Sequence, residues 1–437
     1  MKTAKAAIRD RKTARRRAAI LVLTLWIIVV LGLISASMLE DIFLELKLAK
    51  FQRDDFEAMC LARAGLARAV ADLRNDMTMD RSGRTDPYDA LGDIWARPDE
   101  DKVGRDNQGV AMGRGRYFVW VDDEAGKFDL DTVSRSPSLL RIVLQELGLP
   151  PKEVETVANA IFDYRDGDDQ VTLTPGTTPA GAVKEDEYYS SLAAKESGKR
   201  WSKDDGPIYR CKNDRFSSVD ELLSVYGVTP KMFYGVDPKK ETLPGPIERL
   251  KARAEEARKG EARKRPLGLR DVLTANSAGA LNINTADKFA LRVVFRMVLT
   301  NPKLAEGAAD KVLAFRKPDS RGNQSSEKAF HNIVQLETAA GLPPGSAERI
   351  RTAGNVTLDV RSDTYRISAL GEVNQTQHLI TAVVIRGYEV CQSDQLNPLF
   401  DKGTINSRLR DAFRRRHPET RGLIEQATVR VVQWQDQ

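Results

Sequence analysis

The chain has 437 residues, and its 68 Lys and Arg against 62 Asp and Glu give a formal charge of +6. A hydrophobic fraction of 41% and a charged fraction of 30% are ordinary for a globular protein, which excludes a disordered chain and a multi-span membrane protein. Three cysteines (Cys60, Cys211 and Cys391) are too few for a disulfide scaffold, and their spacing matches no zinc site.

The positive charge is concentrated at the N-terminus. Residues 1–17 hold eight basic residues and one acidic residue, a charge of +7. The other 420 residues hold 60 basic and 61 acidic residues, a charge of −1. A net positive charge alone suggests a nucleic acid partner, but this distribution indicates membrane topology instead.

Residues 18–39 are predicted to span a membrane. They include no charged residue in 22 positions, and a helix needs about 20 apolar residues to cross a bilayer. The basic residues precede this segment, and Glu40 and Asp41 follow it, so we expect a single pass with the first 17 residues in the cytoplasm and everything after residue 40 outside. The alternative is a secretory signal peptide cleaved after Ser37, although the apolar core of such a peptide has only about 7–15 residues.

The helical pattern continues beyond the membrane segment. Apolar residues recur at steps of three and four from Ile42 to Leu73, with charged residues between them. We therefore predict one helix over residues 19–75, whose first part (19–39) is lipid-soluble and whose second part is amphipathic.

A basic leader (residues 1–18) before a long apolar helix resembles the type IV pilin-like proteins. The resemblance implies cleavage by prepilin peptidase between Ala18 and Ala19, with Ala18 standing where such leaders usually have Gly. Leu23 then takes the fifth position, where most pilins carry Glu. A carboxylate in a bilayer is costly unless it is paired, so Leu23 suits a subunit with no neighbour above it, as in the minor pseudopilin K family of type II secretion systems. The alternative is that Leu23 marks an ordinary single-pass anchor.

The soluble part contains an internal repeat. The segment Gly126–Val133 matches Gly279–Ala286 position by position, and in each an Asx and a Thr precede an apolar helix, as expected of a helix cap. The segment Phe216–Pro230 aligns without gaps with Phe330–Pro344, and each is predicted to be a short helix that ends in a Gly followed by Pro.

The repeat predicts two related all-helical units, residues 126–237 and 271–355. The connector between them, residues 238–270, is rich in alternating charges and is expected to be a solvated helix or a flexible linker. Small helical units also suggest helix-hairpin-helix DNA binding. That reading is disfavoured because proline removes donors from both turns, which begin at Gly227 and Gly341.

Strands are predicted on either side of the helical units, at Gly115–Asp122, Asp363–Gly371 and Leu379–Arg386. They define a small αβ domain made of residues 76–125 and 356–390. The predicted fold class is therefore α+β: a pilin-like long N-terminal helix with a small antiparallel sheet and a large all-helical insertion of two related units.

Residues 391–437 are predicted to form a separate C-terminal tail, outside the family resemblance. Within it, Ala427–Trp434 could be a further strand.

The first helical unit carries a dense acidic cluster around Gly167. Hard cations such as Ca²⁺ take oxygen ligands from flexible, Gly-containing acidic loops, and the resemblance also implies calcium in this family. The spacing is not that of an EF-hand, and a solvated acidic loop is the alternative. The candidate ligands are Asp163, Asp166, Asp168, Asp169, Glu185, Asp186 and Glu187.

Over about residues 15–390, several motifs resemble the K family and follow in its order. They are Asp123–Asp131, Ile161–Asp166, Glu185–Tyr189, Asn213–Leu222, Leu281–Ala286, Asp363–Gly371 and Leu379–Arg386. The resemblance implies a minor pseudopilin at the tip of the pseudopilus, which helps to initiate and cap the filament that exports folded proteins. It implies complexes with the I and J minor pseudopilins. No catalytic motif such as G-x-S-x-G or H-E-x-x-H is present, so we expect no enzyme activity and no nucleic acid partner. The alternative from another class is a generic single-pass membrane-anchored periplasmic binding or scaffold protein.

Overall fold

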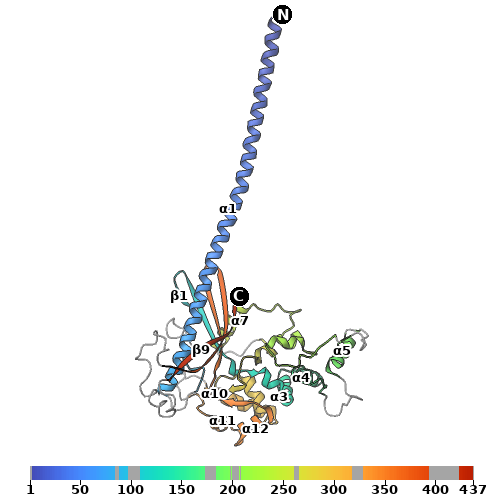
Figure 1. Cartoon of the computed structure of the whole chain (residues 1–437), viewed down its shortest axis with the longest axis vertical. Coiled ribbons are helices and arrows are strands. Elements are labelled where there is room, and N and C mark those ends of the chain that lie inside the picture. The colour runs from blue at the N-terminus through green and yellow to red at the C-terminus, as the bar shows by residue number, and fades with distance from the viewer. Residues whose placement is uncertain are drawn as a thin grey trace.

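The computed structural model describes residues 2–83, 88–96, 109–172, 184–196, 198, 206, 208–259, 265–316, 328–392 and 423–436. A long N-terminal rod leads into a bulky body that combines a sheet with many short helices (Figure 1). The predicted α+β class is confirmed by these elements.

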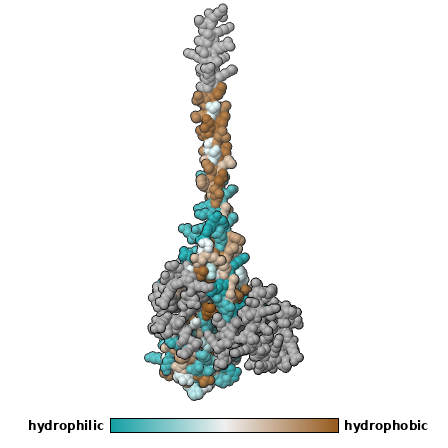
Figure 2. Space-filling view, turned by 90° about the vertical axis from the view of Figure 1, so that its left-hand side faces the viewer, coloured by the Kyte–Doolittle hydropathy of each residue, from teal (hydrophilic) through white to brown (hydrophobic). Residues whose placement is uncertain are grey.

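The rod is one helix, α1 (Lys2–Gly83), of 82 residues. The prediction of a single continuous helix is confirmed, but the predicted bounds of 19 and 75 are wrong, because the helix is longer at both ends. Ala, Arg and Lys are strong helix formers and occupy 12 of the first 17 positions, and no proline occurs before Pro87. The segment Ala19–Met77 contains an apolar stretch long enough to cross a membrane, which is the brown band in Figure 2.

Five strands form an antiparallel sheet in the order β1-β2-β7-β8-β9. The three strands predicted from the sequence are β2, β7 and β8. The strand bounds are β1 (Val110–Met112), β2 (Gly115–Asp123), β7 (Thr364–Val373), β8 (Thr376–Gln392) and β9 (Leu423–Asp436).

The strand β9 corrects the predicted C-terminal tail. It pairs with β8 from Leu423 to Asp436, so this part of residues 391–437 belongs to the sheet and the αβ domain does not end at residue 390. The predicted strand Ala427–Trp434 is confirmed as part of β9. Sequence proximity did not suggest the pairing, because 30 residues separate Gln392 from Leu423.

The second half of α1 packs on one face of this sheet. Small residues alternate with leucines on the buried side of the helix, so its backbone approaches the strands closely. A Cβ added at Gly371 of β7 would collide with the carbonyl oxygen of Ala58. The core between them includes Ala58, Ala62, Leu66, Ala69, Leu73, Tyr365, Ile367, Ala369, Ile380 and Ala382.

The insertion between β2 and β7 consists mainly of helices. Its first part contains η1 (Glu124–Gly126), β3 (Phe128–Asp129), α2 (Leu130–Ser134), α3 (Pro137–Glu146), α4 (Pro151–Arg165), α5 (Glu185–Glu196), η3 (Val219–Ser224) and α6 (Pro230–Tyr234). After α7 (Pro246–Lys259), its second part contains α8 (Leu269–Val272), β4 (Leu273–Thr274), β5 (Ala280–Asn282), α9 (Lys288–Arg296), α10 (Pro302–Arg316), α11 (Ile333–Ala340), α12 (Ser346–Gly354) and β6 (Thr357–Asp359).

The two parts are not all-helical, which corrects the prediction, and they are joined to one another. Two parallel strand pairs occur, β3 with β4 and β5 with β6. The pair β3–β4 joins the first part to the second, and one hydrophobic core runs through both. Each copy of the repeated motif begins with a short strand whose apolar residue, Phe128 or Leu281, is buried. The next residue caps the turn that follows: Asp129 accepts a hydrogen bond from the Thr132 N–H, and Asn282 accepts one from the Asn284 N–H.

The closing motif of the repeat differs between its copies. In the second copy it forms α11, whereas in the first copy the helix is a 3-10 helix, η3. Both copies end at a glycine with positive φ, 79° at Gly227 and 70° at Gly341, as the sequence predicts.

The charged connector contains a helix, α7, that lies against the sheet. Arg253 donates to Asp122 of β2 at 2.9 Å, and the Lys251 ammonium lies 5.7 Å from the ring centroid of Phe118. One side of this helix is therefore held by β2.

Candidate metal centre

Three of the seven predicted acidic ligands meet where α4 ends and α5 begins. Asp163 lies in the last turn of α4, Asp166 follows that helix as its C-cap, and Glu185 opens α5. One carboxylate oxygen from each lies within 4.8 Å of the other two. The bridge between Gln170 and Lys184 brings the start of α5 back to the turn.

Asp163 is fully buried and already has donors. Its carboxylate accepts a hydrogen bond from the Tyr189 hydroxyl at 2.7 Å and from the backbone N–H of Thr172 at 3.1 Å. Burial raises the pKa of Asp163 and these donors oppose the rise. Tyr189 therefore holds the carboxylate in place from the side of α5.

Asp166 and Glu185 are in the opposite situation. The Oδ1 atom of Asp166 and both carboxylate oxygens of Glu185 are buried, and within the described residues none accepts a hydrogen bond from nitrogen or oxygen. The Cys211 thiol, a weak donor, is the polar group beside Glu185. Burial and the neighbouring carboxylates raise the pKa of Asp166 to about 7 and that of Glu185 to about 8.

The site therefore has more acceptors than donors. Like charges this close, in a buried place, are unfavourable unless a proton or a cation compensates them. An all-oxygen set of carboxylates is the donor type that Ca²⁺ and Mg²⁺ prefer, so these three side chains fit a hard divalent cation.

The other four candidates have different roles. Asp168 Oδ1 accepts a hydrogen bond from the Gln170 N–H at 2.8 Å, and Asp169 lies 3.4 Å from the Lys184 ammonium. Asp186 Oδ1 accepts from the Cys211 N–H at 2.8 Å, which fixes the segment after α5. Glu187 does not belong to the three-carboxylate group.

A second group of buried carboxylates was not predicted. Asp76 of α1, Asp89 and Asp93 converge, and Arg386 of β8 donates to Asp76 at 2.9 Å and also to Asp89. The backbone N–H of Ala90 donates to Asp93 at 2.7 Å. Each carboxylate has a partner, so this group joins α1 to the sheet as a structural network.

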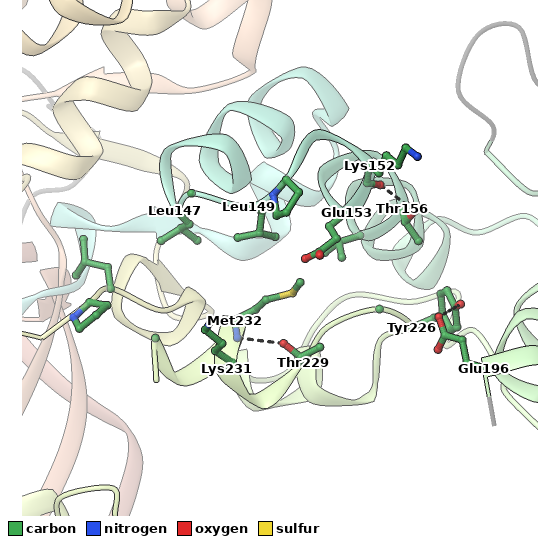
Figure 3. A pocket seen from close by; sticks show the side chains of 17 residues that line it. Leu147, Leu149, Lys152, Glu153, Thr156, Glu196, Tyr226, Thr229, Lys231 and Met232 are labelled. Carbon is green, nitrogen blue, oxygen red and sulfur yellow. Dashed lines mark hydrogen bonds between the residues drawn. The ribbon is translucent and has the colours of Figure 1, made fainter. Parts of the chain in front are cut away.

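A groove of about 760 Å³ lies apart from both carboxylate groups, between the α3–α4 turn and the segment around α6 (Figure 3). Leu149 and Met232 line it from opposite sides, and near one end the Tyr226 hydroxyl donates to Glu196 at 2.7 Å. Its lining includes Gly227 from the closing motif of the repeat and Leu267 from the charged connector. None of the seven predicted ligands lines it.

Comparison with known proteins finds a family model that is similar to part of the helical insertion. Residues 126–239 match the family model described as Type II secretion system (T2SS), protein K. The expected resemblance to the K family is therefore confirmed. The matched range holds β3, α2 to α6 and all seven predicted ligands.

A curated relative carries the same description. The chain is 25% identical to the Type II secretion system protein K of Pseudomonas aeruginosa over 209 residues, which cover 46% of this chain and 55% of the relative. The chain thus spans about half the length of the curated relative it matches. A solved structure of the GspK-GspI-GspJ complex from the enterotoxigenic Escherichia coli Type 2 Secretion System aligns with 89% of this chain and 99% of the solved chain, at 13% identity and a TM-score of 0.47.

The predicted processing residues lie within α1. The helix runs through Ala18 and Ala19 without interruption. Leu23, in the apolar segment of the helix, is 61% exposed. The predicted cleavage between Ala18 and Ala19 remains a prediction.

Proposed function

We propose that the chain is a minor pseudopilin of a type II secretion system, placed at the tip of the pseudopilus, with a role in initiating and capping the filament and no catalytic role. The K-family match of the helical insertion carries this proposal. The long apolar helix that continues into a packed sheet supports it. A bulky side domain of this kind would obstruct stacking inside a thin filament, which favours the tip.

The proposed topology is a single pass through the inner membrane with the first 17 residues in the cytoplasm. The charge of +7 before the apolar segment and the acidic residues after it support this orientation. In the proposal, prepilin peptidase removes the leader. Mass spectrometry of the mature chain from cells that contain this peptidase should find an N-terminus at Ala19.

An intact leader at residues 1–18 in that experiment would favour the alternative, a single-pass membrane-anchored periplasmic scaffold that never enters a filament. Ala18→Gly is the matched variant, because it supplies the residue that such leaders usually have. If neither chain is cut, pseudopilin processing is excluded.

The proposed partners are the I and J minor pseudopilins of the same secretion system. The solved relative is a complex of K, I and J proteins. In α1, apolar residues between the membrane segment and the sheet are exposed, among them Phe43, Leu46 and Phe51. Co-purification of the full chain with I and J in detergent should depend on this stretch, and Phe43→Glu/Leu46→Glu should abolish it while Leu304→Glu, an exposed leucine on α10, should leave it intact.

We also propose that Asp163, Asp166 and Glu185 hold a calcium ion. The buried oxygens without donors on Asp166 and Glu185 support this proposal. Isothermal titration of the full chain in detergent should show calcium binding that Asp166→Asn/Glu185→Gln removes. Asp214→Asn, a nearby exposed carboxylate, is the control and should bind calcium normally. Absence of calcium heat for the unmutated chain would exclude the site.

A further inference from the structure

A residue outside the acidic cluster reaches the same turn. Asn213 lies after α5, in the left-handed backbone region with a φ of 52°. Its backbone N–H donates to the Tyr164 carbonyl at 3.0 Å. Its side-chain Nδ2 donates to the Asp168 carbonyl at 2.8 Å and to Asp169 Oδ1 at 3.3 Å. Asn213 is thus bound on both sides of the turn that holds Asp166.

The other end of this amide has no partner. Asn213 Oδ1 is buried and accepts no hydrogen bond within the described residues. The orientation of the amide is fixed, because Nδ2 faces two acceptors and a flip would set an oxygen against both of them. A buried acceptor without a donor is unfavourable, so Oδ1 requires a compensating group.

Four buried oxygens without nitrogen or oxygen donors therefore come from three segments around one turn: Asp166 Oδ1, both oxygens of Glu185 and Asn213 Oδ1. Every one of them is an acceptor. A water molecule would satisfy at most two of them with its two protons, whereas a hard cation is satisfied by oxygens alone. The amide oxygen also adds a ligand without adding a charge to three mutually repelling carboxylates.

We propose that Asn213 Oδ1 is a ligand of the cation held by Asp163, Asp166 and Glu185. This inference rests on the proposed calcium site. A cation with these ligands fastens the segment around Asn213 to the end of α4 and the start of α5. Binding then stabilises the contact between segments that are far apart in the sequence.

Terbium luminescence tests direct ligation. Tb³⁺ takes calcium-type sites, and the nearby Tyr189, which donates to Asp163, can sensitise it. Luminescence decay in H₂O and D₂O counts the water molecules on the bound ion. In the full chain in detergent, Asn213→Gly should add about one water to bound Tb³⁺ and weaken calcium binding about tenfold, because one protein ligand is lost.

The variants are chosen to separate ligation from backbone effects. Glycine adopts positive φ freely, so Asn213→Gly should fold, and Asn213→Ser is a second variant whose side chain is too short to reach the ion. Asn213→Asp keeps an oxygen in place and should restore the hydration count. Asn355, which caps α12 with a φ of 56°, gives the control Asn355→Gly, which should change neither quantity.

An unchanged hydration count in Asn213→Gly and Asn213→Ser would overturn the inference, even if calcium affinity falls, because Asn213 would then only position Asp168 and Asp169. In that outcome the calcium site itself stands, provided that Asp166→Asn/Glu185→Gln abolishes binding. If the unmutated chain binds neither Tb³⁺ nor Ca²⁺, both the site and the inference fail.

Discussion

Two neighbouring carboxyl groups, Asp123 and Glu124, have opposite pKa shifts because their partners differ. Burial raises the pKa of Asp123 to about 6, since its hydrogen-bond donors, such as Ser362 at 2.6 Å, are neutral. Burial would also raise the pKa of Glu124, but Lys127 and Arg366 outweigh it and lower that pKa to about 2. A neutral donor satisfies a carboxylate, whereas a cation also stabilises its charge.

Glu124 therefore links the stability of the fold to pH. Its pKa falls from 4.5 to about 2 on folding, so its contribution is complete above about pH 4.5 and is lost as the pH falls toward 2. We expect Glu124→Gln to lower the free energy of unfolding by about 3 kcal/mol at pH 7 and by much less near pH 2. Urea unfolding at both pH values measures this difference, and an equal loss at both would contradict it.

At the scale of elements, the contact of α1 with β7 depends on a glycine. A Cβ at Gly371 would meet the Ala58 carbonyl oxygen, and backbone cannot move aside as a side chain can. We expect Gly371→Ala to destabilise the fold by about 3 kcal/mol, at the upper end for overpacking. Thermal unfolding of the full chain in detergent is the measurement.

Gly307 gives the matched control for this substitution. It lies on the exposed side of α10 with nothing within 4 Å of an added Cβ. Gly307→Ala should stabilise the helix by about 0.5–1 kcal/mol, because alanine favours helices over glycine. If both variants unfold like the unmutated chain, the close approach of α1 to β7 is not important for stability.

The spacing of apolar and β-branched residues predicted most helices and strands, but it did not predict which elements pack or pair with one another. The apolar spacing predicted α1, and β-branched runs predicted β2, β7 and β8. The short pair β3–β4 was missed, because strands of two residues carry no periodicity and the pairing joins residues 145 apart, Phe128 and Leu273. The repeat itself was visible, but it does not reveal that its two copies share one core.

At the scale of the whole molecule, that shared core makes the insertion one folding unit. Phe128 is 2% exposed and pairs with Leu273 of the other part. Arg292 and Arg296 of α9 both bind Glu146 of α3, the latter at 2.6 Å. Removal of either part would expose apolar surface of the other.

We therefore expect residues 126–237 alone to remain unfolded, whereas residues 124–362 should fold, because only the longer fragment contains both halves of the core. The amide region of an NMR spectrum distinguishes the two outcomes. A dispersed spectrum from residues 126–237 would show that the first part needs no partner and would contradict the prediction.

The sequence identified the acidic cluster around Gly167 but not which of its carboxylates come together. Acidic density around Gly167 identified Asp163, Asp166 and Glu185 among seven candidates. Composition could not separate them from Asp169 or Asp186, because only the fold decides which carboxylate points inward and which meets Lys184 or a backbone N–H. Tyr189 and Asn213 were not assigned to the site, since neither is acidic.

The two ends of the insertion lie side by side on adjacent strands of the sheet. Asp123, where β2 ends, lies directly opposite Tyr365 at the start of β7. A tensile load applied along α1 enters the sheet through the side chains packed beneath the helix and passes between β2 and β7 through their shared hydrogen bonds. The insertion is attached beside this path and does not lie in series with it. It can therefore change in size without altering the length of the subunit along α1.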